Sequence, residues 1–184
     1  MAHIIFIYGP IAVGKLTVAE ILAKDLGYTL THNHAVNDLV TDVFDKKSKE
    51  YDRIVEKMRF AFLLAVAGTD ARVVTTHCYA HDYVNKTTGM SDPEYVVELI
   101  RRFKEAGAEV SVIHLKAETE TLIGRVDGES RKRFRKLVDV ETMKELSLKR
   151  DWQTSAPIEG QLVIDTTKQS ADEVVEIIKE HFKL

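Results

Sequence analysis

Short apolar runs alternate with amphipathic stretches along the whole chain. The apolar runs predict strands at residues 3–8, 28–31, 72–77, 109–115 and 161–165. Between them apolar residues recur at helical spacing, which predicts helices over residues 18–26, 35–46, 52–67, 92–106 and 119–126, from about 140 and from 170. This alternation predicts an α/β fold with a parallel sheet that helices cover on both faces.

Local signals mark where several of these helices begin and end. Asp92 is expected to cap the helix that starts there, because a proline and a glutamate follow it in the first turn, and Gly107 is expected to stop that helix. Residues 170–173 have the pattern of a capping box. No repeat or low-complexity linker divides the chain, so we expect residues 1–184 to form a single domain.

Composition excludes several classes of protein. The 184 residues carry a net charge of -3, which argues against a nucleic-acid partner because phosphate neutralisation needs a broad positive surface. The longest apolar stretch, residues 60–68, is far shorter than the roughly 20 residues that span a bilayer. Cys78 is the only cysteine, so no internal disulfide forms, and we expect it in the core near a strand end. These features predict a soluble cytoplasmic protein without a membrane partner.

The first strand runs directly into a glycine-framed loop that carries the clearest chemical signal. Gly9 and Gly14 frame it, and Lys15 follows the second glycine at the start of a helical stretch. Glycine permits backbone angles that turn N–H groups inward at the positive end of a helix, and a lysine there reaches the β- and γ-phosphates of a nucleotide. This strand–loop–helix pattern is that of a phosphate-binding P-loop.

The P-loop lacks the usual magnesium ligand. Leu16 follows the lysine where many P-loops have Ser or Thr, and Thr17 comes one place later. We therefore read Thr17 as a phosphate contact and as the remaining candidate for holding Mg²⁺. The spacing, with a proline after the first glycine, resembles adenylate kinase and its nucleoside monophosphate kinase relatives. The nucleotide-binding candidates in the loop are Gly9, Pro10, Ile11, Ala12, Val13, Gly14, Lys15, Leu16 and Thr17.

A basic segment lies between the predicted fourth and fifth strands. Residues 125–136 contain six lysines and arginines, which on a surface helix would form only a solvated face. In a P-loop protein they can neutralise the negative charge on the phosphoryl group during its transfer. The position resembles the lid of small P-loop kinases, at about residues 125–137. Arg131 and Arg135 are the expected catalytic phosphate contacts, and Arg125 and Arg133 are further candidates.

Polar side chains follow the second predicted strand. His32, Asn33 and His34 lie where shikimate- and gluconate-kinase-like enzymes bind the acceptor, and Asp38 lies one turn further on. His34 or Asp38 could take the acceptor's proton. Arg59 interrupts an apolar helix face, where small kinases of the shikimate and nucleoside monophosphate type hold the acceptor's anion; a snorkelling arginine at the core edge is the alternative.

Two other strand ends carry polar residues. His77 ends the third predicted strand where a Walker B strand would usually supply an acid, and Asp82 is a weak substitute for that acid. Thr166 follows the last strand, at the place where related kinases pass beside the nucleotide base. The alternative is that Thr166 and its neighbours serve only to cap the following helix.

Nearly the whole chain resembles P-loop small-molecule kinases such as adenylate, shikimate and gluconate kinases and chloramphenicol phosphotransferase. It is also similar to bacterial proteins described only as AAA-type or shikimate-kinase-like ATPases. The resemblance implies a three-layer P-loop NTPase fold, with a five-stranded parallel sheet in the order 2-3-1-4-5 and a small basic lid. It further implies a monomer or homodimer that uses ATP and Mg²⁺ to phosphorylate a hydroxyl or phosphate of a small-molecule acceptor.

Two alternatives to a kinase remain open from the sequence. The missing magnesium ligands favour a nucleotide-binding regulatory or partner-binding module. An ATPase coupled to another protein is the second alternative, although nothing resembles a sensor or oligomerisation domain.

Overall fold

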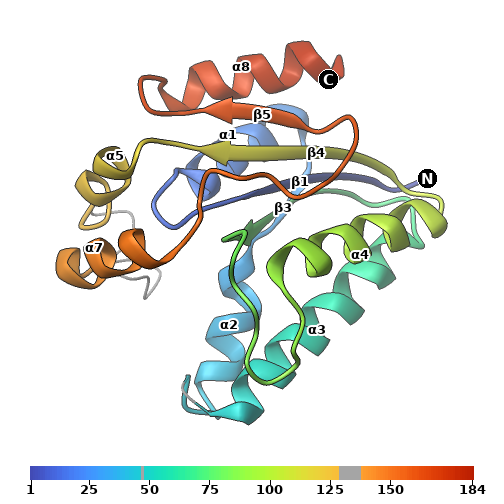
Figure 1. Cartoon of the computed structure of the whole chain (residues 1–184). Helices are drawn as coiled ribbons and strands as arrows, with labels where there is room; N and C mark the ends of the chain where they lie inside the picture. Colours follow the sequence, from blue (N-terminus) through green and yellow to red (C-terminus); the bar gives the residue numbers. More distant parts are fainter. Residues whose placement is uncertain (47, 129–137) are drawn as a thin grey trace.

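The centre of the fold is a five-stranded parallel sheet. The computed structural model describes residues 1–46, 48–128 and 138–184. The strands are β1 (His3–Gly9), β2 (Thr29–Thr31), β3 (Arg72–Cys78), β4 (Glu109–Lys116) and β5 (Leu162–Asp165). They pair in the order β2-β3-β1-β4-β5 (Figure 1), which confirms the predicted fold class and strand order.

Two hydrophobic layers form because successive residues of β1 point to opposite faces of the sheet. Ile5 and Ile7 pack in the core with helices α1 (Lys15–Leu26) and α8 (Ala171–Phe182). Ile4, Phe6 and Tyr8 pack on the other face with α3 (Lys49–Ala67) and α4 (Asp92–Glu105). The central strand is therefore buried on both faces, as expected of a three-layer α/β fold (Figure 1).

The remaining helices surround the carboxyl ends of the strands. Helix α2 (Asn33–Thr41) directly follows β2. Helices α5 (Thr119–Gly124) and α7 (Val140–Lys149) lie beyond the ends of β4 and β5 (Figure 1). In a parallel α/β sheet this is the edge where ligands bind.

Two predicted helix boundaries are wrong. Helix α2 ends at Thr41 rather than near residue 46, and Ser48 caps α3 through a hydrogen bond from the backbone N–H of Tyr51 at 3.1 Å. Helix α4 is capped by Ser91 and not by Asp92, because the Ser91 hydroxyl accepts from the backbone N–H of Glu94 in a complete capping box. The carboxylate of Asp92 is therefore available for another role.

The loop between α7 and β5 covers part of the sheet on the same side as α4, and buried polar contacts hold this loop in place. The hydroxyl of Tyr8 accepts the backbone N–H of Ala156 at 3.0 Å. Nδ1 of the fully buried His114 lies 2.8 Å from the hydroxyl of Ser155, and its ring stacks on Tyr8 with centroids 4.6 Å apart. This anchoring fixes the chain between α7 and β5 close to the ends of the strands.

Candidate active site

The P-loop has the backbone geometry that the sequence predicts. Gly9 and Gly14 have φ angles of 146° and 98°, both in the region that disfavours side chains. A Cβ on Gly9 would also lie 2.1 Å from the carbonyl oxygen of Leu115 in β4, so the loop passes against the backbone of that strand. Ala12 is left-handed as well, with φ 65°. Such local strain is typical of functional loops.

Lys15 is the first residue of α1 and turns back over the loop. Its Nζ donates hydrogen bonds to the carbonyl oxygens of Gly9 at 2.7 Å and Pro10 at 2.5 Å. The ammonium group therefore lies over the loop whose N–H groups and helix terminus attract phosphate. Thr17 lies exposed in the first turn of the same helix. Within the described residues, no group of three or more His, Cys, Asp or Glu side chains forms a metal cluster.

Two residues predicted near the nucleotide, Arg125 and Thr166, come together beside the P-loop. Arg125 donates to the hydroxyl oxygen of Thr166 at 3.1 Å and to its carbonyl oxygen at 2.9 Å. The buried Thr166 hydroxyl in turn donates to the carbonyl oxygen of Val13 in the P-loop at 3.3 Å. The end of β5, the start of the basic segment and the P-loop are thus joined. The other basic candidates, Arg131, Arg133 and Arg135, lie outside the described residues.

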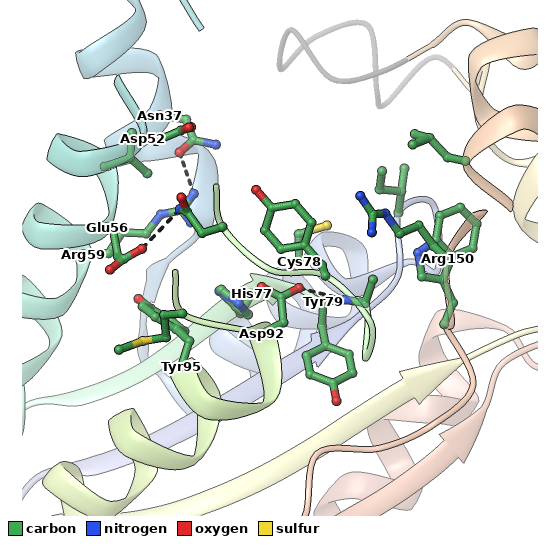
Figure 2. A pocket seen from close by; sticks show the side chains of 18 of the residues that line it. Asn37, Asp52, Glu56, Arg59, His77, Cys78, Tyr79, Asp92, Tyr95 and Arg150 are labelled. Atoms are coloured by element: carbon green, nitrogen blue, oxygen red, sulfur yellow. Dashed lines mark hydrogen bonds between the residues drawn. The ribbon is translucent and has the colours of Figure 1, made fainter. Parts of the chain in front are cut away.

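A cavity of about 380 Å³ adjoins the P-loop (Figure 2). Its walls come from the P-loop, α2, α3, the end of β3, the segment before α4, the first turns of α4 and the chain at the end of α7. The lining residues are Ile11, Asn37, Tyr51, Asp52, Val55, Glu56, Arg59, His77, Cys78, Tyr79, Ala80, Tyr83, Asn85, Met90, Asp92, Tyr95, Leu146, Arg150 and Trp152. A largely apolar hollow with a few convergent polar groups is the usual form of a small-molecule site.

Of the predicted acceptor-binding residues, Arg59 lines this cavity. Its guanidinium donates to Oδ1 of Asn37 at 2.5 Å, which fixes it between α3 and α2 (Figure 2). Burial lowers the pKa of Arg59 below its ordinary value. Asn37 was not predicted; the neighbouring Asp38, which was, is not among the lining residues.

The predicted His32, Asn33 and His34 stand at the start of α2. His32 is the N-cap residue of that helix and does not line the cavity. Asn33 and His34 form its first turn, and their side chains lie outside the described part of the structure. Their assignment to the acceptor stays a prediction.

Asp92 is the functional candidate that sequence reasoning missed. It is the first residue of α4 and lines the cavity, and its Oδ2 accepts the backbone N–H of Ala80 at 2.8 Å. Burial raises the pKa of the Asp92 carboxyl to about 7, against the lowering effect of that hydrogen bond and of Arg150 and Arg59. In Figure 2 the carboxylate lies between His77 and Tyr79, with Arg59 and Arg150 on opposite sides.

The end of β3 contributes two further side chains to the cavity. His77 is buried between aromatic rings, with the Tyr95 ring stacked at 4.8 Å, and burial holds its pKa well below 6.5. Its Nε2 has no hydrogen-bond partner among the described residues. Cys78 was expected in the core, but it is exposed and lines the cavity, because β3 ends there and its last side chain passes beyond the packed layer.

Arg150 is another residue that the sequence did not single out. It follows α7, lies over the ring of Tyr83 at 5.2 Å and pairs with Asp82 at 3.3 Å. Asp82 also accepts the backbone N–H of Asp151 at 2.8 Å. Asp82, which had been a weak candidate for the missing Walker B acid, thus secures the wall that carries Arg150.

Two cavity carboxylates hold the segment before α4 against α3. Oδ2 of Asp52 accepts from the hydroxyl of Thr87 at 3.1 Å. Oε2 of Glu56 accepts from the hydroxyl of Thr88 at 2.9 Å and from the side-chain amide of Asn85 at 3.2 Å. These contacts form one wall of the cavity.

In the part of the chain that the structure describes, no helix is long and apolar enough to cross a membrane.

Comparisons with known proteins agree with this geometry. A family model described as an AAA domain matches residues 5–144. A cytidylate kinase of Streptococcus pyogenes is 30% identical, over 96% of this chain and 94% of that protein. A gluconokinase structure from Sinorhizobium meliloti has a TM-score of 0.59 at 14% identity, over 99% of this chain and 91% of that one. A shikimate kinase structure from Aquifex aeolicus has a TM-score of 0.54 at 16% identity, over 98% and 96%.

The two solved structures share the fold of this chain. The family model and the cytidylate kinase are similar to it in sequence over most of its length. The chain therefore belongs to the AAA-domain family that matches residues 5–144, and it is a P-loop small-molecule kinase.

Proposed function

We propose that this protein transfers the γ-phosphoryl group of ATP to a small molecule bound in the cavity. The observation that carries the proposal is that the cavity and the P-loop share a wall. Ile11 belongs to both, and the backbone N–H of Tyr79 in the cavity wall donates to the carbonyl oxygen of Gly9 at 3.0 Å. A molecule in the cavity would then lie beside the terminal phosphate of a nucleotide on the P-loop, as in-line transfer requires.

The residues of the loop suit a nucleotide triphosphate. The positive φ angles at Gly9, Ala12 and Gly14 shape a loop that suits the β- and γ-phosphates. The N-terminus of α1 and the ammonium of Lys15 add positive charge there. We assign Arg125 and Thr166 to the side of the site that faces the nucleotide base. Thr17 is the P-loop residue that would hold Mg²⁺ when ATP is bound. The ion would neutralise the charge that develops on the phosphates.

Nucleotide titrations test this assignment without knowledge of the acceptor. Isothermal titration with a non-hydrolysable ATP analogue should give binding to the natural protein and about tenfold or greater loss in Lys15→Ala, because a charge-assisted contact contributes about 1.5–3 kcal/mol. Lys24→Ala, in the last turn of the same helix, is the matched control. Equal affinity in a folded Lys15→Ala variant would remove the basis of the proposal.

The dependence of ADP formation on an acceptor distinguishes a kinase from a regulatory module and from an uncoupled ATPase. A kinase forms ADP in proportion to phosphorylated acceptor. An uncoupled ATPase forms ADP and inorganic phosphate with no acceptor, and a binding module forms neither.

A further inference from the structure

The partly buried carboxylate of Asp92 stands next to the P-loop. The backbone of Tyr79 bonds directly to Gly9, the first glycine of the loop, and the next residue, Ala80, donates its N–H to Asp92. Two adjacent residues thus make the contact with the P-loop and the contact with the Asp92 carboxylate. The carboxylate is fixed by Oδ2, and among the described residues nothing donates to Oδ1.

We propose that the acceptor is a ring-bearing alcohol without a phosphate group, and that Asp92 binds its reacting hydroxyl and accepts the proton. The inference rests on the proposed function. The hydroxyl oxygen forms a bond to the γ-phosphorus while the bond from that phosphorus to the β–γ bridging oxygen breaks. The proton of the hydroxyl passes to Oδ1 of Asp92, and ADP leaves with the electron pair of the broken bond. Asp92 then releases the proton to solvent.

The charge of the cavity argues against a phosphate acceptor. Its described lining carries three carboxylates, on Asp52, Glu56 and Asp92, and two guanidiniums, on Arg59 and Arg150. A phosphomonoester dianion needs a surplus of positive charge, usually from arginine forks. A further two negative charges in this lining would be repelled, and Asp92 could not remain ionised beside them. A phosphate acceptor also has no need of a base.

The walls indicate the rest of the molecule. The rings of Tyr51, Tyr83, Tyr95 and Trp152 line the cavity, whereas the ring of Tyr79 packs on Tyr8 in the core. Flat rings of this kind bury a ring or apolar body and leave hydroxyl groups for the polar residues. The buried Nε2 of His77, which has no partner in the described structure, offers one further hydrogen bond to such a molecule.

The proton affinity of Asp92 suits the proposed role. A carboxyl with a pKa of about 7 is half ionised near neutral pH, where a general base is most effective. The charged groups that act on it are Arg59 from α3, Asp82 from the segment before α4 and Arg150 after α7. The other titratable groups around it in the cavity are His77, Tyr79, Tyr83 and Tyr95.

The experiment compares alcohols with their own phosphate esters. ATP-dependent ADP release is measured with a library of phosphate-free ring-bearing alcohols and a matched library of their phosphomonoesters, which include cytidine and CMP, pyridoxine and its phosphate, and thiamine and its monophosphate. We expect at least one alcohol to be phosphorylated and its ester to be inert. Conversion of a phosphomonoester to a diphosphate in preference to its alcohol would overturn this inference and leave the proposed function standing. If no compound of either library stimulates ADP release, the proposed function is contradicted, and this inference with it.

The role of Asp92 is tested on the alcohol that responds. Asp92→Asn should lower kcat by about 10²–10⁴, the usual contribution of a general base, and should change ATP affinity less than about twofold. The kcat/KM of the natural protein should rise with pH through about 7 and then level off, because the ionised carboxylate is the active form. The variant should lose that rise.

The matched control is Asp172→Asn, which makes the same change in the first turn of α8 on the opposite face of the sheet. It should leave kcat and the pH profile unchanged. A folded Asp92→Asn variant with full kcat and an unaltered pH profile would show that Asp92 serves only to hold Ala80.

Discussion

Arg125 and Thr166 are 41 residues apart in sequence, yet the guanidinium of Arg125 donates hydrogen bonds to both the hydroxyl and the carbonyl oxygen of Thr166. Because Thr166 is also bonded to Val13, this pair connects the P-loop with the segment that leads into the basic residues. A nucleotide on the P-loop would meet both residues at one edge of its site.

From this connection we predict that Arg125→Ala weakens ATP binding by about five- to tenfold, equivalent to about 1–1.4 kcal/mol, because it removes a charge and loosens Thr166. Thr166→Val, which removes only the hydroxyl, should have a smaller effect in the same direction. Titration calorimetry measures both, with the exposed Arg101→Ala as control. Affinities equal to that of the control would show that the pair has only a structural role.

Gly9 should tolerate no side chain. Gly9→Ala would place a Cβ 2.1 Å from the carbonyl oxygen of Leu115, and backbone atoms of a central strand cannot move away cheaply. We expect a loss of at least about 3 kcal/mol in the free energy of unfolding, or failure to fold. Gly160→Ala is the control, because Gly160 also has positive φ but no atom within 4 Å of its Cβ, so strain alone should cost about 1 kcal/mol. Urea denaturation of the two variants decides, and equal losses would contradict the steric account.

Arg59 should act on the acceptor and not on the nucleotide. Arg59→Lys keeps the charge but loses the fork that donates to Asn37 and faces the cavity. Once an acceptor is known, its KM should rise about tenfold or more, the effect of one lost charge-assisted hydrogen bond, while ATP affinity stays within about twofold. Steady-state kinetics with each substrate varied in turn checks this. A variant whose ATP affinity falls as far as its acceptor affinity would remove Arg59 from the acceptor site.

His114 should make stability depend on pH. Burial lowers the pKa of His114 from 6.5 to about 4. Between pH 6.5 and about pH 4, His114 is therefore protonated in the unfolded chain but largely neutral in the folded chain. The stabilisation is complete above pH 6.5 and is lost as the pH falls towards 4. His114→Gln cannot titrate, so its free energy of unfolding should fall less between pH 7 and about pH 5, by about 2 kcal/mol. Urea denaturation of both proteins at the two pH values measures the difference, and parallel losses would show that His114 does not titrate in this range.

The P-loop could be predicted from sequence because its conformation is local. Gly9, Gly14 and Lys15 lie within one short loop, and their φ angles and contacts follow from residue types at fixed spacing. The strand order came from the resemblance to small kinases, since alternation alone predicts a parallel sheet without its order.

The acceptor cavity could be predicted only in part, because it is assembled from seven separate segments. Asp92 was taken for a helix cap, and a shift of one residue, to Ser91, turned its carboxylate into the cavity. In the same way Asn37 lines the cavity while its neighbour Asp38 does not. One residue is a rotation of about 100° on a helix, and sequence alone does not set that rotation.

The transfer itself is tested most directly by following the labelled γ-phosphate of ATP in the presence of the acceptor libraries. With a responding acceptor, the label should appear in an organic phosphate, one for each ADP formed, and Lys15→Ala should abolish the product. Label found only in inorganic phosphate, at the same rate with and without any acceptor, would contradict the account.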